Sequence, residues 1–426
     1  MQRIAIVDGL RSPFIKAWTS FNDVTAQKLG AFCCRQLLEE TNIKAGQIDE
    51  VIFGTVAQPA EAANIARVIS LYANIPVEKR AYTVSRNCAS GFEAVSSAYE
   101  KIQVGLDSVV LAGGSESMSN IPFFFSKDTA KILLQLNKAK TFFAKLKTVS
   151  KIRPRHLKPI PGLFLGLSDP VCGLSMGQTA EILAKEYGIT RQAQDEFSLA
   201  SHKKSIAARE KLREEITPFM VGAPGFKNLI SDDNGPRENQ TLEALAKLKP
   251  YFERYTGTVT AGNSSQITDG ACALLIMTED KAKSLGYEPL GYIRAYTYVG
   301  LEPQKMGLGP AYAIPEVLKK AELTLKDMDL IEINEAFAVQ VLASLKLLST
   351  KSFIEENFSN HKDLAGFKMD KLNVNGGAVS LGHPVGSTGA RMILTILKEM
   401  KRRNSKFGLA SLCVGGGQGG AFILER

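Results

Sequence analysis

The chain has 426 residues, of which 45% are hydrophobic and 22% charged, so it has the composition of an ordinary folded protein and is long enough for two or three domains. Its net charge of +9 is concentrated in residues 121–160, which hold ten Lys or Arg and one acidic residue, and this excludes a nucleic-acid-binding surface spread over the whole protein. No apolar run reaches the ~18 residues of a membrane-spanning helix, and six cysteines without a C-x-x-C pair predict a reduced, cytoplasmic protein with neither a disulfide framework nor a metal site.

The predicted elements repeat at half the length of the chain. The first copy has expected strands at 3–7, 51–56, 81–85 and 108–112, with helices before the second strand and at 92–104. The second copy has expected strands at 291–299, 330–334, 372–375 and 408–412, with helices before the second strand and at 391–401. A strand at 271–277 closes the first copy. Because strands alternate with helices, we expect mostly parallel sheets covered on both faces.

Cys88 lies at the turn between the expected strand 81–85 and the expected helix 92–104. At such a turn a thiol meets unpaired backbone N–H groups and the positive end of the helix dipole, both of which favour the thiolate. The alternative is a small apolar residue packed beneath the helix. His383, between Gly382 and Pro384, and Cys413, followed by a Gly-rich turn, are further candidates in the second copy.

Five motifs occur in a fixed order along the chain, at 85–94, 262–271, 334–338, 375–391 and 413–420. Together they resemble the thiolase family over nearly the whole chain. The resemblance implies an α/β fold of two duplicated, mostly parallel sheet halves in five layers, α-β-α-β-α, with an inserted loop domain. The implied boundaries are 1–120 plus 263–277 for the N-terminal half, 121–262 for the inserted domain and 278–426 for the C-terminal half.

The resemblance also assigns catalytic roles. It implies the reaction acyl-CoA + acetyl-CoA ⇌ CoA + 3-oxoacyl-CoA, with Cys88 as the nucleophile that carries the acyl group. His383 matches the base that activates it, because a thiol is weakly nucleophilic until it loses its proton. Cys413 matches the cysteine that moves a proton at the α-carbon. One oxyanion site would use His383 and a water held by Asn334, and the other the backbone N–H groups of Cys88 and Gly415.

Substrate binding is implied at three further positions. Ser265 would contact the pantetheine arm of coenzyme A, Met176 would form a wall of the pantetheine tunnel, and Arg237 would lie near the nucleotide. From its own context Arg237 could equally be a solvated loop charge. Coenzyme A and acyl-CoA are expected as substrates, with no cofactor. The G-x-G-x-x-G spacing that begins at Gly415 is not read as a dinucleotide site, because the sequence after it continues as a strand.

The basic segment carries apolar residues at helical spacing, namely Ile132, Leu136, Ala139, Phe143 and Leu146. They predict one helical face, which either packs on its own loop domain or meets an anionic membrane or a partner chain. This segment and residues 353–358 resemble the thiolase subunit of trifunctional-type fatty-acid oxidation complexes. That likeness implies a hydratase/dehydrogenase partner subunit and peripheral membrane contact through 121–155. The family implies a homodimer or homotetramer. The subgroup often has histidine where this chain has Asn334.

We therefore expect thiolysis of 3-ketoacyl-CoA in fatty-acid β-oxidation. The first alternative is an acetyl-CoA C-acetyltransferase that makes acetoacetyl-CoA, which the same residues would serve. A decarboxylating ketoacyl synthase is disfavoured by the second cysteine, Cys413. A catalytically silent lipid-binding scaffold is disfavoured because the four catalytic side chains are present together.

Overall fold

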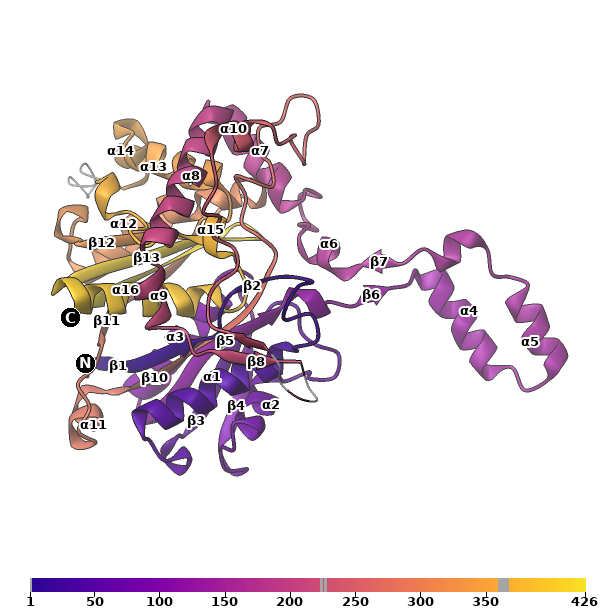
Figure 1. The fold of residues 1–426 in the computed structure, drawn as a ribbon, viewed down its shortest axis with the longest axis horizontal. Coiled ribbons are helices and arrows are strands. Elements are labelled where there is room, and N and C mark those ends of the chain that lie inside the picture. The colour runs from indigo at the N-terminus through magenta and orange to yellow at the C-terminus, as the bar shows by residue number, and fades with distance from the viewer. Residues whose placement is uncertain (1, 223–224, 226–227, 359–367) are drawn as a thin grey trace.

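The computed structural model describes residues 2–222, 225, 228–358 and 368–426. A mixed sheet of ten strands runs through both halves of the chain (Figure 1). Its order is β12 (Leu330–Ile333), β13 (Phe407–Val414), β14 (Gln418–Glu425), β11 (Gly291–Gly300), β1 (Ile4–Arg11), β10 (Thr268–Thr278), β5 (Val109–Ser117), β3 (Glu50–Gly54) and β4 (Arg80–Val84), with the short β2 (Ile15–Lys16) paired to β10.

Each half contains one strand that opposes the others. In the N-terminal half β1, β5, β3 and β4 run in one direction and β10 in the other. In the C-terminal half β11, β13 and β12 share a direction and β14 opposes them. The halves join where β1 and β11 pair antiparallel at Ala5 with Tyr292 and at Ile6 with Gly291. The predicted mostly parallel halves are confirmed.

Helices cover both faces of each half and produce five layers (Figure 1). The outer helices α1 (Ala26–Thr41) and α2 (Ile65–Tyr72) pack on the N-terminal half. The outer helices α12 (Gly309–Ala321) and α13 (Ala338–Leu348) pack on the C-terminal half. Between the two sheet halves lie α3 (Ser90–Gln103) and α16 (Thr388–Arg403), whose apolar side chains share one core with strands of both halves. The predicted α-β-α-β-α arrangement is therefore confirmed.

The duplication is visible element by element. The short 3-10 turns η1 (Ala45–Gln47) and η5 (Leu325–Asp327) precede β3 and β12 in the same way. The expected strand 372–375 is wrong, because Leu372 alone bridges Ile331. At Asn373 the backbone turns into the left-handed region at φ 44°, and its side chain hydrogen-bonds both the N–H and the C=O of Ile333 at 2.9 Å. The Asn373 side chain thus makes the hydrogen bonds to Ile333 that the backbone of a paired strand would make.

Residues after β5 leave the sheet and return at β10. This excursion contains η2 (Met118–Asn120), β6 (Phe123–Phe124), α4 (Lys127–Lys138), α5 (Phe142–Val149), η3 (Pro154–Leu157), β7 (Ile160–Pro161), α6 (Gly162–Gly166), α7 (Met176–Glu186), α8 (Arg191–Ala207), α9 (Arg209–Arg213), β8 (Phe219–Val221), β9 (Asn228–Ile230) and α10 (Leu242–Ala246). It is fastened to β1 by the fully buried Arg11, which pairs with Glu215 and Asp233 at 2.7 Å each. The domain boundaries given above remain a prediction.

The paired strands β6 and β7 carry α4 and α5 away from the body of the molecule (Figure 1). We call α4, α5 and their connection, residues 127–149, the basic hairpin. The single helical face predicted here is wrong, because the helix stops at Ala139 and restarts after Thr141, whose hydroxyl accepts from the Ala144 N–H at 3.2 Å. Nor is the segment packed away: Phe142 and Phe143 are 74% and 81% exposed.

The remaining elements of the C-terminal half are η4 (Pro303–Leu308), α14 (Lys351–Asn357), η6 (Met369–Lys371) and α15 (Ala378–Leu381), and α11 (Glu279–Ser284) links the halves. In the part of the chain that the structure describes, no helix is both long and apolar enough to cross a membrane.

Candidate active site

Cys88 lies in a tight turn between the end of β4 and the first residue of α3. The Ala89 N–H donates to the Arg86 carbonyl at 2.9 Å and the Ser90 N–H to the Asn87 carbonyl at 3.0 Å. Asn87 adopts a positive φ of 44°, which asparagine tolerates better than most residues. The turn therefore presents the half-buried Cys88 thiol at the beginning of α3.

The thiol is not the preformed thiolate that the sequence suggested. Burial raises the pKa of Cys88 above its usual value, and the charge of Glu116 adds to that effect. Hydrogen bonds from the N–H groups of Gly415 and of Cys88 itself lower the pKa without reversing the shift. The two N–H groups predicted as an oxyanion site therefore both face the Cys88 sulfur. Since the resting group is a thiol, attack requires a base.

The Cys413 turn lies against the Cys88 turn. Asn87 Nδ2 donates to the Gly415 carbonyl at 2.7 Å. Cys413 is fully buried near the end of β13, and the pKa of its thiol is raised by burial and by the neighbouring Cys88. Met176, at the start of α7, closes the turn from outside, since a Cβ on Gly415 would lie 3.2 Å from its sulfur. The structure thus brings Cys88, Cys413, Gly415 and Met176 together.

His383 is buried in the connection between α15 and α16, and its ring is oriented by a threonine. Its Nδ1 lies 2.6 Å from Thr388 Oγ1, while that hydroxyl donates to the Pro384 carbonyl at 3.0 Å. A hydroxyl has one proton to donate, so it accepts from the histidine, and Nδ1 carries the hydrogen. Nε2 is then unprotonated, and its lone pair can accept a proton.

The imidazole is neutral as well as oriented. Burial, together with the smaller effect of the positive charge of Arg391, lowers the pKa of His383 to about 3. Arg391 is itself fully buried and forms an ion pair with Glu332. A neutral ring whose Nε2 is unprotonated can act as a general base at neutral pH.

Asn334 completes this side of the site. It follows β12 directly, and its Nδ2 lies 3.5 Å from His383 Nε2. Its Oδ1 is buried and has no hydrogen-bond partner among the described residues. A buried amide oxygen of this kind is suited to hold a water or a substrate group.

The predicted binding residues lie at different depths. The half-buried Ser265 is next to this group, because its N–H donates to the Ala336 carbonyl at 2.9 Å and the next residue, Gln266, accepts from the His383 N–H at 3.3 Å. Arg237 is exposed, and its backbone N–H donates to His202 Nδ1 at 3.2 Å. Its side chain therefore lies at the surface, which is compatible with a solvated charge and with contact to a nucleotide.

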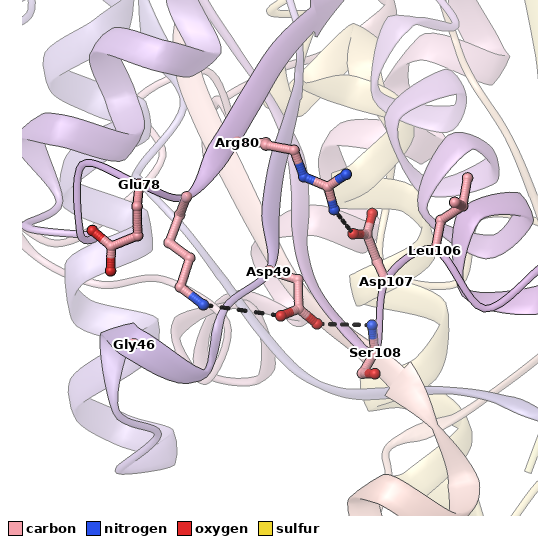
Figure 2. Close-up of a pocket in the computed structure, with 8 residues that line it drawn as sticks. Gly46, Asp49, Glu78, Arg80, Leu106, Asp107 and Ser108 are labelled. Atoms are coloured by element: carbon pink, nitrogen blue, oxygen red, sulfur yellow. Dashed lines mark hydrogen bonds and ion pairs between the residues drawn. The ribbon is translucent and has the colours of Figure 1, made fainter.

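Cys88, Asn334 and Cys413 lie at the carboxyl ends of β4, β12 and β13, where open α/β sheets bind ligands. A cavity of about 460 Å³ lies instead at the amino ends of β3, β4 and β5 (Figure 2). Its walls carry the ion pairs Arg80–Asp107 and Lys79–Asp49, so each of these charged groups has a partner of opposite charge. This cavity is at the opposite end of the N-terminal half from Cys88.

Sequence reasoning missed the residues that support the site. Thr388 lies in the same motif as His383, and its hydroxyl five residues later was the available signal. Asn87 precedes Cys88 directly but braces Gly415, which is distant in sequence. Glu116 acts on Cys88, and Arg391 acts on His383, through charge within the same half of the chain. The burial that gives these charges their effect is not visible in a local sequence pattern.

A partly exposed thiol, a neutral imidazole and a second buried thiol, on a duplicated five-layer fold, are the groups expected of a cysteine-dependent acyl-transfer site. Two family descriptions match the chain: "Thiolase, N-terminal domain" over residues 4–280 and "Thiolase, C-terminal domain" over residues 287–426. The chain therefore belongs to the thiolase family of acyltransferases.

Two bacterial relatives are similar to this protein over nearly the whole length of the chain. A 3-ketoacyl-CoA thiolase of Pseudoalteromonas translucida is 45% identical and one of Escherichia coli O157:H7 is 43% identical, each over 99% of this chain and 97% of the relative. Among solved structures, the Bacillus anthracis acetyl-CoA acetyltransferase is 36% identical with a TM-score of 0.87, covering 100% of this chain and 99% of that one. Human mitochondrial 3-ketoacyl-CoA thiolase in complex with CoA is 34% identical with a TM-score of 0.84, covering 100% and 98%.

Proposed function

We propose that the protein is a 3-ketoacyl-CoA thiolase of fatty-acid β-oxidation. The observation that carries this proposal is the convergence of Cys88, Cys413 and the Gly415 N–H on one thiol-lined site. The relatives named 3-ketoacyl-CoA thiolase, 45% and 43% identical over nearly their full length, support this substrate.

We propose that thiolysis proceeds as follows. The Cys88 sulfur attacks the C3 carbonyl carbon of 3-ketoacyl-CoA while His383 Nε2 takes the thiol proton. The C2–C3 bond breaks, and acetyl-CoA leaves as an enolate. The acyl group, shorter by two carbons, stays on Cys88 until the thiol of CoA attacks it. We propose that the backbone N–H groups of Cys88 and Gly415, which approach the Cys88 sulfur in the resting protein, stabilise the carbonyl oxygen as it gains charge.

The raised pKa of Cys413 fits its role in this sequence. A thiol whose pKa lies well above the usual value is protonated at neutral pH. It can therefore donate a proton to C2 of the departing acetyl-CoA enolate. When CoA attacks acyl-Cys88, the Cys413 thiolate takes the proton of the CoA thiol, and protonated His383 returns its proton to the released Cys88 sulfur. In the reverse direction the Cys413 thiolate removes the proton from C2. We propose that Asn334, with a water, and His383 stabilise the enolate oxygen. The reaction as proposed uses protein groups and coenzyme A thioesters and requires no cofactor.

We propose that Ser265 and Met176 line the path of the pantetheine arm, since both adjoin the reacting groups. Arg237 is proposed as a surface contact for the nucleotide. Its exposure allows it to reach a phosphate at the entrance, where it would act as a charge partner.

The test is loss of 3-ketoacyl-CoA absorbance on addition of CoA, comparing acetoacetyl-CoA with a long-chain substrate. Faster thiolysis of the long chain supports the β-oxidation function. Activity confined to acetoacetyl-CoA would replace it with the acetyl-CoA C-acetyltransferase function, which the likeness to the Bacillus anthracis enzyme favours. If there is no turnover and Cys88 is not acylated by acyl-CoA, the alternative of a catalytically silent lipid-binding scaffold would be favoured.

We further propose that the basic hairpin docks the enzyme on an anionic membrane or on a hydratase/dehydrogenase partner subunit, as in the trifunctional-type complexes that the sequence resembles. Exposed apolar side chains and lysines occur together on α4 and α5, and charged lipid attracts this combination. The test replaces residues 125–159 with a short Gly-Ser linker, which keeps β6 and β7 in place. Loss of sedimentation with anionic vesicles at unchanged turnover supports membrane docking. Equal sedimentation of the wild-type protein and the linker variant would contradict membrane docking.

We also propose that the protein is a homo-oligomer, a dimer or tetramer, in the cytoplasm. β4 ends the sheet, and the exposed Tyr72 and Val77 adjoin it, so a second copy has apolar surface to cover. Sedimentation equilibrium should give two or four times the mass of the chain. A concentration-independent monomer would contradict this proposal.

A further inference from the structure

The segment that carries His383 is held on both sides by buried carboxylates. Glu335 contacts it before the histidine and Glu116 contacts it after the histidine. Each of these residues is 1% exposed, so each carboxylate depends on protein donors for its hydrogen bonds. Glu335 comes from the C-terminal half and Glu116 from the end of β5 in the N-terminal half.

Glu335 joins three separate segments at the entry to α15. Its Oε2 accepts from the Ser201 hydroxyl of α8 at 2.6 Å and from the Val379 N–H at 3.2 Å. Its Oε1 accepts from Asn373 Nδ2 at 2.7 Å. A Cβ on Gly377 would lie 2.6 Å from this oxygen, so glycine is required for the approach. Glu335 is the residue after Asn334. Its hydrogen bond to the Val379 N–H therefore connects the backbone beside Asn334 to the segment that carries His383.

Glu116 makes the matching contact after His383. Its Oε2 accepts from the Gly386 N–H at 2.8 Å and from the Val56 N–H at 3.0 Å. Its Oε1 accepts from the Ala57 N–H at 2.9 Å and from the Thr55 hydroxyl at 3.3 Å. Four donors from two segments therefore converge on one buried carboxylate.

The loop held by Glu116 also lies against the helix that begins beside Cys88. A Cβ on Gly91 of α3 would lie 3.0 Å from the Gly386 carbonyl oxygen. A Cβ on Gly386 would lie 2.9 Å from Glu116 Oε2 and 2.8 Å from Thr55 Cα. The backbones are therefore in close contact, and a shift of the Gly386 loop changes the position of His383 relative to Cys88.

We propose that Glu116 and Glu335 are positioning residues that together clamp residues 377–386 and so fix the general base His383 between Cys88 and Asn334. Neither carboxylate needs to touch substrate for this role. Proton transfer requires donor and acceptor within about 3 Å, and a displacement of about 1 Å at an active site costs on the order of 100-fold in rate. The inference rests on the proposed thiolase reaction, because it assigns His383 as the base.

Glu116 has a second effect that separates the clamp from a purely structural role. Its negative charge contributes to the raised pKa of Cys88. Replacing it with neutral glutamine therefore shifts the ionisation of Cys88 to lower pH, even while turnover falls. Loss of stability alone produces no such shift in the folded fraction.

The experiment compares Glu116→Gln and Glu335→Gln with the wild-type enzyme and with Asp49→Asn as a matched control. Asp49 Oδ2 accepts the N–H groups of Ser108 and Val109 at 2.8 and 3.0 Å, so it caps the other end of β5 far from His383. For each protein we would measure kcat and KM for acetoacetyl-CoA thiolysis, the melting temperature, and the pH dependence of Cys88 alkylation by iodoacetamide, read on the Cys88 peptide.

Both clamp variants should lose about 10- to 100-fold in kcat with little change in KM, while Asp49→Asn keeps wild-type kcat. The alkylation midpoint should move to lower pH in Glu116→Gln. In Glu335→Gln the alkylation midpoint should be the same as in the wild type, but alkylation at neutral pH should be slower than in the wild type. Clamp variants that keep kcat within about twofold of wild type, whatever their melting temperature, would overturn the proposal. Absence of turnover in the wild type would count against the proposed reaction instead. The clamp would then be judged by alkylation alone: the shifts described above would support it, and alkylation like that of the wild type in both variants would contradict it.

Discussion

Replacing Thr388 with valine tests whether one hydroxyl sets the tautomer of His383. The change keeps the shape of the side chain and removes the acceptor that lies 2.6 Å from Nδ1. Because the ring is buried, its Nδ1–H is then left unpaired, or the hydrogen moves to Nε2 and blocks the base. In either form one ring nitrogen has lost its partner, and the competent Nδ1–H form becomes less favourable by the cost of an unsatisfied buried donor, about 1–3 kcal/mol.

That cost corresponds to a fall in kcat of about 5- to 150-fold, since each 1.36 kcal/mol is tenfold in rate. The assay is steady-state thiolysis of acetoacetyl-CoA together with the rate of Cys88 acylation in a single turnover. Thr388→Ser is the matched control, because it keeps the hydroxyl and should lose much less activity than the valine variant. Equal kcat for wild type and Thr388→Val would refute the assignment of the proton to Nδ1.

Three further outcomes follow from the structure. Cys413→Ala should still become acetylated at Cys88 by acetyl-CoA but should not condense two acetyl groups, and condensation near the wild-type rate would contradict the proton-shuttle role. The pKa of His383 is lowered from 6.5 to about 3, so its neutral form stabilises the fold above pH 6.5 and this stability is lost as the pH falls toward 3. The free energy of unfolding by urea should therefore drop by about 2–3 kcal/mol more in wild type than in His383→Gln between pH 7 and 4.5, and equal losses would argue against a buried neutral ring. Arg11→Met leaves two buried carboxylates without their partner and should cost about 3–5 kcal/mol in the same assay, whereas a change below about 1 kcal/mol would show that the ion pairs contribute little.

The sequence predicted the duplicated architecture because each strand and helix carries its own periodic pattern. β10 is an example: ten of its eleven residues are buried, as expected for a strand covered on both faces. The strand expected at 372–375 was wrong because apolar residues are compatible with a strand, whereas the chain actually turns at Asn373 and pairs through its side chain. The continuous helical face in the basic segment was wrong because Thr141 restarts the helix.

The candidate catalytic residues could be found because they lie in ordered motifs, but their electrostatics could not. The turn before α3 suggested a thiolate at Cys88, and burial reverses that direction. Burial depends on which segments cover a residue, and here the covering segments are distant in sequence. For the same reason Glu116 and Glu335, each of which contacts several separate segments, carried no recognisable local signal.

The central claim is that Cys88 carries the acyl group, and mass spectrometry of the intact protein and its peptides tests it most directly. The purified enzyme is incubated with a long-chain 3-ketoacyl-CoA in the absence of free CoA, so that the second half of the reaction cannot proceed. We predict an adduct on the Cys88 peptide with the mass of the acyl chain shortened by two carbons, which free CoA then removes. An unmodified Cys88, or an adduct confined to another cysteine, would contradict the account.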